Sequence, residues 1–129
     1  MIDGSNVMHW KGGDPDIATV TEVILKLTKL GYHPGVVFDA NAGYLLTGQY
    51  EHDDALARAV GLPPDRVMVV DKGTQADPVL LQAARDFDSK VVTNDRFRDW
   101  EDDYPEIHSD GFLIKGHYIA GQLKLSIDT

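Results

Sequence analysis

The feature that most constrains the fold is a short apolar run that recurs along the chain and stops at or near an aspartate. Runs of this kind precede Asp3, Asp39, Asp71 and Asp95, and they are rich in β-branched residues. Stretches with apolar residues at helical spacing separate them. Strands that alternate with helices predict a three-layer α/β/α fold with a mainly parallel central sheet. The carboxyl ends of such strands meet at one edge, so the aspartates are expected to share a crevice there.

The first long helix is predicted to begin at Asp14-Pro15, with Asp14 as the N-cap and Pro15 at the first helical position, and to end at Gly31. The other expected elements are strands over 36–39, 66–71 and 90–93, helices over 51–60 and from Asp77-Pro78 onward, and a helical turn over 96–100. Phe87 is expected to face inward from the later helix. The run over 66–71 is apolar on both faces, which predicts a strand covered by helices on each side.

The two ends of the chain carry weaker patterns. Met1-Ile2-Asp3 is shorter than the roughly five residues of an ordinary strand, so we expect a first strand that is cut short. Residues 112–115 and 123–127 are predicted to form two strands of a C-terminal hairpin that turns near Gly121. The acidic stretch 101–106 is expected to be a solvated loop.

Composition limits the kind of site that the chain can build. A length of 129 residues predicts a single domain over 1–129, and the absence of cysteine excludes disulfides, thiolate zinc sites and cysteine nucleophiles. No apolar run reaches the roughly 20 residues of a membrane span, so a cytoplasmic protein that does not bind membranes is expected. The net charge of −9 argues against extensive contact with phosphates. A polynucleotide is therefore expected to be held by a few basic residues and by metal.

Several acids are candidates for a metal site, because clustered carboxylates repel one another and a hard divalent cation offsets that repulsion. Asp3 follows a strand and Asn6 lies close behind it, although Asp-Gly-Ser-Asn is also an ordinary turn sequence. Asp77 is a candidate ligand and equally a helix cap. Asp95 and Asp99 are spaced i, i+4, which places both on one side of a helical turn, and a plain surface position is the alternative for Asp99.

Other side chains have both a functional and a structural interpretation. Arg96 and Arg98 are candidates to reach phosphate. Asp39 is either part of the site or a strand terminator. Trp10 and Tyr44 are candidates to stack on bases or to pack in the core. The five histidines lack ligand spacing, which favours surface or core roles over zinc.

Three segments together resemble the PIN-like ribonucleases, and the NYN group in particular. They are Ile2-Asp3-Gly4-Ser5-Asn6, Gly73-Thr74-Gln75-Ala76-Asp77 and Thr93-Asn94-Asp95-Arg96-Phe97-Arg98-Asp99. The likeness is to the regnase-like catalytic domain that is associated with CCCH zinc fingers, and it extends from the first residues to about Trp100. It implies a PIN-like fold and endonucleolytic cleavage of single-stranded or structured RNA with Mg²⁺, or Mn²⁺ in its place.

Carried over by position, the resemblance implies that Asp3, Asp77, Asp95 and Asp99 bind metal and that Asn6 supports the site. Lys72, Arg96 and Arg98 are then candidates to bind substrate. The chain departs from the regnase pattern in three ways: it has no zinc finger, its first strand is short, and it has one acid at Asp77 where the regnase domain has a pair. The last departure leaves one or two metal ions as alternatives.

Two other functions are compatible with parts of the sequence. A phosphatase of the haloacid-dehalogenase type needs a second aspartate two residues after the nucleophilic one, and Ser5 stands there after Asp3. A catalytically inactive PIN-like module that binds RNA or another protein would explain the low positive charge. Retention of the whole acidic set argues for the enzyme instead. A homodimer formed through the C-terminal hairpin is a further expectation.

Overall fold

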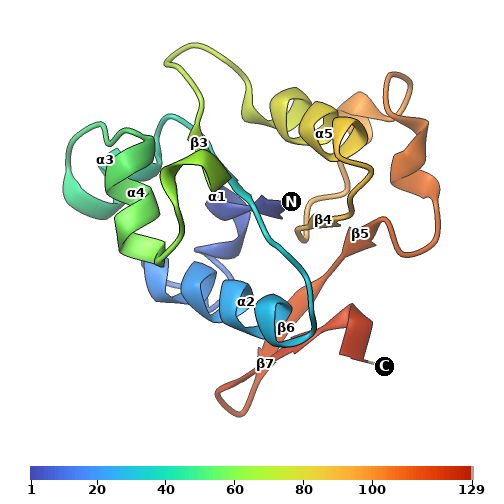
Figure 1. Ribbon diagram of the computed structural model, residues 1–129, viewed down its shortest axis with the longest axis horizontal. Helices are drawn as coiled ribbons and strands as arrows, with labels where there is room; N and C mark the ends of the chain where they lie inside the picture. The colour runs from blue at the N-terminus through green and yellow to red at the C-terminus, as the bar shows by residue number, and fades with distance from the viewer. Residues whose placement is uncertain (129) are drawn as a thin grey trace.

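The computed structural model describes residues 1–128, and a five-stranded parallel sheet forms its centre (Figure 1). The strand order is β3-β2-β1-β4-β5, so the strands run outward from β1 first to one side and then to the other. Their bounds are β1 Ile2–Asp3, β2 Val36–Phe38, β3 Val67–Val69, β4 Val91–Val92 and β5 Leu113–Ile114. The mainly parallel α/β fold expected from the sequence is thus confirmed.

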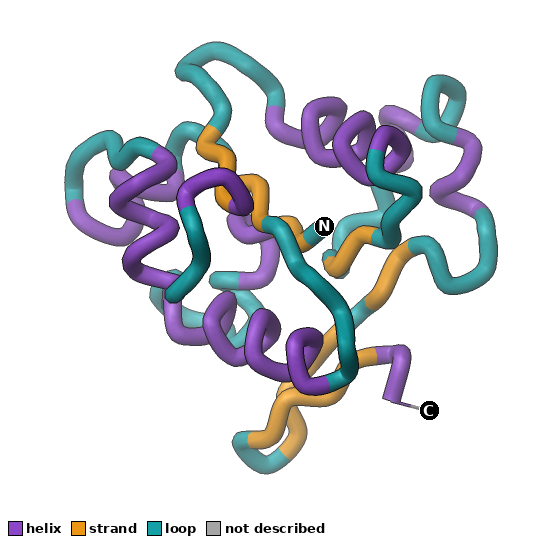
Figure 2. Tube along the Cα trace, viewed as in Figure 1, coloured by secondary structure: helices purple, strands orange, loops and turns teal. Residues whose placement is uncertain are grey.

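Helices cover both faces of this sheet. Helices α2 and α4 pack together on one face, whereas α5 lies across the other, as the tube in Figure 2 shows. The helices are α1 Gly4–Val7, α2 Ile17–Lys29, α3 Ala42–Thr47, α4 Asp53–Val60 and α5 Ala76–Asp86. Short 3₁₀ turns occupy Pro64–Arg66, Arg98–Trp100, Pro105–His108 and Ser126–Asp128. Within residues 1–128, no helix combines the length and apolar character needed to cross a membrane.

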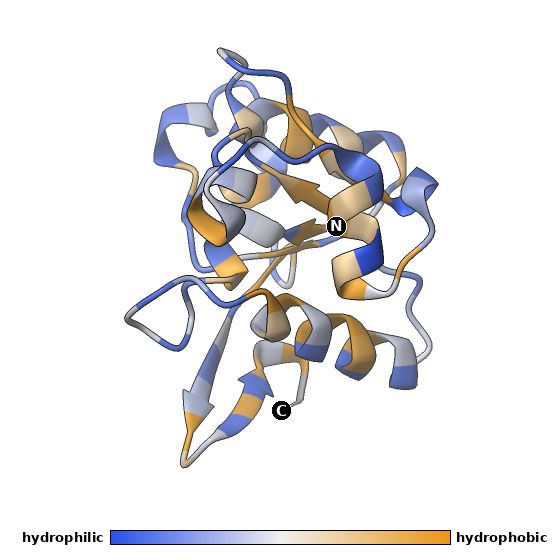
Figure 3. Cartoon of the chain, turned by 90° about the vertical axis from the view of Figure 1, so that its left-hand side faces the viewer, coloured by the Kyte–Doolittle hydropathy of each residue, from blue (hydrophilic) through white to orange (hydrophobic). Residues whose placement is uncertain are grey.

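Alternation along the strands divides the core into two layers. In β2, Val36 and Phe38 face the α2 and α4 side, and Val37 faces α5. In β4, Val91 packs on the α5 side and Val92 on the other. Apart from Asp3 at the end of β1, the residues of these five strands are apolar, and the strands lie between the helices (Figure 3). This pattern is the one that parallel strands buried on both faces require.

Both predicted aspartate N-caps are wrong. Helix α2 is capped by Asp16, whose carboxylate accepts a hydrogen bond from the Ala18 amide at 2.9 Å. The backbone amide of Asp16 donates to the Met8 carbonyl, which holds this residue extended and delays the helix beyond Asp14. Helix α5 is preceded by Gln75, so Asp77 is the second helical residue and not the cap.

The chain after β4 also differs from the prediction. Residues 113–114 form β5, which pairs in parallel with β4 at the sheet edge and is not part of a hairpin. The hairpin consists of β6 Gly116–Ile119 and β7 Gln122–Leu125, with Ala120 and Gly121 in the turn at positive φ. It packs against α2, where Lys26 Nζ donates to the Leu123 carbonyl and Tyr118 donates to Glu22.

Two side chains expected in the core are exposed. Phe87 follows the end of α5 and is 76% exposed, because the helix stops at Asp86 and the chain turns through Asp88 at a φ of 50°. Met68 is 47% exposed, because β3 is an edge strand with a helical covering on only one of its faces at this point. The prediction that helices cover both faces of this run is therefore wrong at Met68, whereas Val70, on the same side, is buried against α5.

Candidate active site

The candidate acids lie where the strand order of the sheet reverses. The chain runs from β1 to β2 and β3 on one side, and then crosses by α5 to β4 on the other side of β1. In open parallel sheets, ligands bind outside the carboxyl ends of the strands at this switch point. Asp3 ends β1 and Asp95 follows β4, so the topology brings two of the four predicted metal-binding acids to this position.

Asp3 is held rigidly at the end of β1. Its Oδ1 accepts the Asn6 amide at 3.2 Å and so caps the short helix α1. Its Oδ2 accepts the Thr93 hydroxyl at 2.9 Å, which joins the ends of β1 and β4. Thr93 is fully buried, and its Oγ1 in turn accepts the Asp95 amide at 3.1 Å. This chain of bonds fixes Asp3 and Asp95 relative to each other.

Two small residues after Asp3 have roles that explain the Gly-Ser sequence. A Cβ at Gly4 would lie 2.6 Å from the Phe38 ring, so only glycine lets α1 pack this closely on β2. Ser5 Oγ accepts the Asp39 amide at 2.8 Å and fixes the carboxyl end of β2. The backbone of α1 is therefore placed by contacts with the neighbouring strand.

Asn6 connects α1 to the loop after β4. Its Oδ1 accepts two hydrogen bonds, from Trp10 Nε1 at 2.8 Å and from the Asn94 amide at 2.9 Å. Those two donors use the carbonyl oxygen of the side chain, which leaves the Nδ2 hydrogens as the groups that a substrate or a water molecule would meet. Asn6 is thus suited to donate to a phosphate oxygen.

Asn94 clamps this loop to the C-terminal hairpin. Its Nδ2 donates to the Gly116 carbonyl at 2.8 Å, and its Oδ1 accepts the Gly116 amide at 3.0 Å. A Cβ at Gly116 would lie 2.2 Å from the Trp10 ring, so glycine is needed for Trp10 to pack here. The side chain of Asn94 therefore acts like a strand neighbour and anchors the start of β6 beside the crevice.

Asp95 and Asp99 are not arranged on one helical turn. Asp95 Oδ1 accepts the Phe97 amide at 2.8 Å, which closes a turn before the helical segment begins. Phe97 adopts a left-handed conformation with φ 52°, and the 3₁₀ turn covers only Arg98–Trp100. The predicted helical turn over 96–100 is wrong in this respect. Both acids nevertheless line one open cavity of about 440 Å³, together with Asp77, Asn94, Phe97, Trp100, Arg96 and Arg98.

Electrostatic interactions show that the acids are close enough to repel one another. Burial raises the pKa of Asp3 to about 6, and the charges of Asp77 and Asp95 act in the same direction against the hydrogen bonds from Thr93 and Asn6. Burial also raises the pKa of Asp77, as do Asp95, Asp39 and Asp99, while a hydrogen bond from Trp100 opposes the rise. The charges of neighbouring acids therefore act on both Asp3 and Asp77.

The three candidate cations are exposed. Lys72 lies in the loop between β3 and α5, and Arg96 and Arg98 border the cavity that Asp77 and Asp95 line. Among the described residues none of the three has an ion-pair partner, in contrast to Lys11 and Arg85, which do. These side chains are consequently available to an anionic ligand.

The donor set is chemically suited to a divalent cation, but it is not closed around one. Carboxylate oxygens are the ligands that magnesium and manganese prefer. The mutual repulsion of Asp3, Asp77 and Asp95 is the condition that such a cation relieves. In the part of the chain that the structure describes, no three His, Asp or Glu side chains are arranged to hold a metal ion directly. Side-chain rotation would be needed to bring the carboxylates together.

Three residues of the crevice were missed by the sequence analysis in the roles that the structure gives them: Thr93, Asn94 and Trp100. Thr93 bonds both Asp3 and the Asp95 amide, and Trp100 bonds Asp77. All three lie within or next to the Thr-Asn-Asp segment. Their hydrogen-bond partners are distant in sequence, so the only sequence feature that could have identified them is their place in or near this segment.

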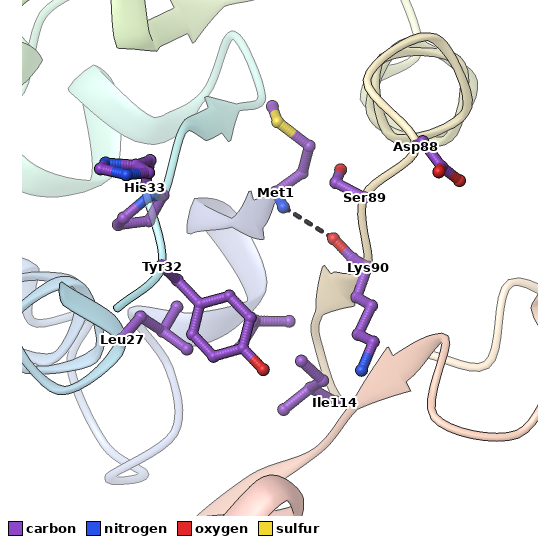
Figure 4. Close-up of a pocket in the computed structure, with 10 residues that line it drawn as sticks. Met1, Leu27, Tyr32, His33, Asp88, Ser89, Lys90 and Ile114 are labelled. Atoms are coloured by element: carbon purple, nitrogen blue, oxygen red, sulfur yellow. Dashed lines mark hydrogen bonds between the residues drawn. The ribbon is translucent and has the colours of Figure 1, made fainter. Parts of the chain in front are cut away.

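Two other cavities lie at the opposite, amino ends of the strands and both include Met1. One, of about 280 Å³, is bordered by Tyr32, His33 and Lys90 (Figure 4), and the other, of about 580 Å³, by Met68 and Phe87. The Met1 amino group donates to the Lys90 carbonyl at 2.7 Å between them. Neither cavity contains a predicted site residue.

Comparison with known proteins identifies the family and supports the fold. Residues 1–110 match the sequence model of a family described as "Zc3h12a-like Ribonuclease NYN domain". No curated protein matches the chain. Among solved structures, two of nuclear protein-only RNase P 2 (PRORP2) from Arabidopsis thaliana are similar, with TM-scores of 0.72 and 0.69 at 18% sequence identity. They cover 96% and 97% of this chain, which spans 28% of the length of each. At this identity the likeness concerns the fold.

Proposed function

Because the chain belongs to the Zc3h12a-like ribonuclease NYN domain family, we propose that it is a divalent-metal-dependent endoribonuclease that hydrolyses RNA phosphodiester bonds at its cluster of aspartates. The observation that supports this proposal is that Asp3, Asp77 and Asp95 lie close together near the switch point of the sheet, where burial and the neighbouring acids raise the pKa of Asp3 and of Asp77. A set of carboxylates placed to repel one another is costly unless a cation binds there.

The proposed metal ligands are Asp3, Asp77, Asp95 and Asp99. Magnesium, or manganese in its place, would supply Lewis acidity toward the phosphate when bound. Whether one ion or two bind would depend on how many of the four carboxylates turn toward the metal. Asp77 does not occupy the N-cap position of α5, so its carboxylate, which accepts a hydrogen bond from Trp100, is not committed to capping the helix.

The remaining polar groups are proposed to bind and orient the RNA. Asn6 Nδ2 would donate to a phosphate oxygen, since its Oδ1 is already used by Trp10 and Asn94. Arg96 and Arg98 would stabilise charge on the phosphate that is attacked. Thr93 holds Asp3 and the Asp95 backbone in register and is a positioning residue. The expected products carry a 5′-phosphate and a 3′-hydroxyl.

A cleavage assay tests this proposal. We expect end-labelled single-stranded RNA to be cut internally by the wild type with magnesium and to remain intact with chelator. Asp95→Asn keeps the size of the side chain and removes its charge, so cleavage should fall by about 100-fold or more, as for the loss of a central electrostatic group.

Asp65→Asn is the matched control, because Asp65 is an exposed acid beside the cavity at the amino ends of the strands. It should cleave like the wild type. Cleavage that persists in chelator, or that is equal in Asp95→Asn, would disprove a metal site at these acids.

A catalytically inactive module that binds RNA or protein is the second candidate function. The observation in its favour is that no three of the described acidic or histidine side chains are arranged to hold a metal as they stand. The same assay decides between the two, because an inactive module binds RNA without cutting it in any metal. A cytoplasmic location and a homodimer remain predictions.

A further inference from the structure

A cluster of aromatic rings with a lysine lies at the same edge of the sheet as the crevice, and the proposed cleavage chemistry does not use its rings. Tyr44 on α3 packs edge-on against Tyr50, with ring centres 6.4 Å apart, and Tyr50 packs against His52 at 4.8 Å. Lys72 Nζ, from the loop after β3, lies 5.3 Å from the Tyr44 ring centre and 5.2 Å from that of Tyr50. Two segments of the chain thus present three rings and a cation together.

The backbone beneath these rings is tightly fixed. A Cβ at Gly43 would lie 2.4 Å from the Glu51 amide nitrogen, so α3 can approach residues 49–51 only because position 43 is glycine. Thr47 Oγ1 lies 3.0 Å from both the Gly43 carbonyl and the Glu51 carboxylate. The rings are therefore held in place by the fold and are not side chains of a loose loop.

The cluster stands at the same edge of the sheet as the acids. Helix α3 begins three residues after Asp39, whose carboxylate accepts the Asn41 amide at 2.7 Å. The charge of Asp39 in turn acts on Asp77 in the crevice. Lys72 follows β3, which is two strands from β1, and this corresponds to about 10 Å across the sheet. A single RNA strand of a few nucleotides would reach from the acids to the rings.

The chemistry of the cluster is suited to a nucleotide. Tyr44 is 43% exposed, while Tyr50 beneath it is only partly exposed and packs against the core. A partly exposed tyrosine ring can stack on any base, because every base has a π face. Lys72 has no ion-pair partner among the described residues, in a chain with a net charge of −9. A positive charge that acidic neighbours have left unpaired is available to a phosphate.

We propose that Tyr44 and Lys72 form a nucleotide subsite of the nuclease, in which Tyr44 stacks on one base of a single-stranded RNA and Lys72 contacts its phosphate. The subsite rests on the proposed ribonuclease function, and it adds binding contacts to the substrate beyond those made at the acids. Stacking tolerates any base, so the subsite selects unpaired RNA and not a particular sequence. Paired bases are stacked on each other and do not offer a free face.

RNA binding by the uncleaving Asp95→Asn protein tests the subsite. Affinity for a short fluorescein-labelled single-stranded RNA is measured by anisotropy in magnesium buffer. Adding Tyr44→Ala should weaken binding about 5- to 100-fold, as loss of one base stack does, whereas Tyr44→Phe keeps the ring and should bind like the parent. Leu45→Ala is the matched control, since Leu45 is a neighbouring exposed residue of the same helix, 54% exposed.

RNAs with one abasic nucleotide identify the stacked base. One abasic position should weaken binding to the parent and have no further effect on the Tyr44→Ala protein, because each change removes the same contact. A Tyr44→Ala protein that binds as tightly as the parent, or a parent that binds no RNA, overturns the subsite.

Cleavage by the wild type is measured separately, so that failure of the two proposals can be distinguished. If the wild type cleaves and Tyr44→Ala leaves RNA affinity unchanged, only the subsite is wrong. If the wild type does not cleave, the nuclease proposal is wrong, and the binding comparison still decides whether Tyr44 contacts RNA.

Discussion

Asp3 is the most buried of the crevice acids, with 9% of its surface exposed, and it bears most directly on stability. Its carboxyl group has a pKa of about 6 in the folded protein, mainly because burial disfavours the charged form. In an unfolded chain an aspartate has a pKa near 3.9. The folded state therefore holds this proton more tightly than the unfolded state does.

The sign of the pH dependence follows. Protonated Asp3 contributes roughly 3 kcal/mol to the free energy of unfolding. This contribution is fully present below about pH 4 and is lost as the pH rises through about 6. We expect the free energy of unfolding, measured by urea titration in chelator, to decline over this range. Asp3→Asn should remove much of the decline. Equal pH profiles for the two proteins would contradict the assignment to Asp3.

For single residues, the sequence predicted where the acids lie along the chain better than it predicted their hydrogen-bond partners. It placed Asp3 and Asp95 correctly at strand ends, because strand ends follow from the apolar runs. It also suggested Asp77 as an N-cap, because Asp-Pro is a common start of a helix. In the structure the N-cap residue of α5 is Gln75, two residues earlier. The hydrogen bond from Thr93 to Asp3 joins residues 90 positions apart, and neither it nor the bond from the Asp95 amide to Thr93 has a local signature in the sequence.

Among the elements, the C-terminal hairpin is joined most closely to the crevice. Asn94 bonds both backbone groups of Gly116, and Trp10 packs against the same glycine while bonding Asn6. The start of β6 and the loop that carries Asp95 are thus parts of one hydrogen-bonded unit. The hairpin helps to shape the site even though it contributes none of the predicted ligands.

Asn94→Ala tests this connection. The substitution removes both hydrogen bonds to Gly116 and leaves two backbone groups without partners, so we expect a loss of about 1–3 kcal/mol in the free energy of unfolding. RNA cleavage should fall through kcat more than through KM, because Asp95 is displaced. Asn41→Ala is the control, since Asn41 is exposed and makes no side-chain cap bond. Unchanged stability in Asn94→Ala would exclude the clamp.

The pairing of the C-terminal strands could not be predicted from the apolar pattern of the sequence. Residues 112–115 and 123–127 are both apolar and lie close in sequence, which favours pairing with each other. Instead β5 pairs with β4, and β7 pairs with β6, a segment with the sequence Gly-His-Tyr-Ile that has little apolar pattern. The free edge of β4 in the parallel sheet can pair with a further strand, and β5 pairs there. This pairing depends on the whole sheet and is not visible in the local sequence pattern.

For the molecule as a whole, the net charge of −9 limits how RNA is held. The proposed phosphate contacts come from Lys72, Arg96 and Arg98, so no more than about three counterions would be released on binding. The logarithm of the RNA affinity should then fall with the logarithm of salt concentration with a slope of about −2. Anisotropy titrations of the Asp95→Asn protein at several potassium chloride concentrations measure it.

A much steeper slope would indicate a basic surface beyond these three residues. Lys72→Gln should reduce the slope by somewhat less than one, since it removes one contact. Lys29→Gln is a suitable control, because Lys29 is an exposed residue at the end of α2. An equal slope in the Lys72→Gln protein would remove Lys72 from the interface.

The order of the strands has a consequence for synthesis of the protein. Asp3 is made before its partner Thr93, which lies 90 residues later, and before its neighbour Asp95, since both follow β4. A nascent chain that stops short of this segment has only one side of the crevice. The proposed cleavage would therefore require a chain that has been made at least through Asp99, because the acids after β4 complete the site.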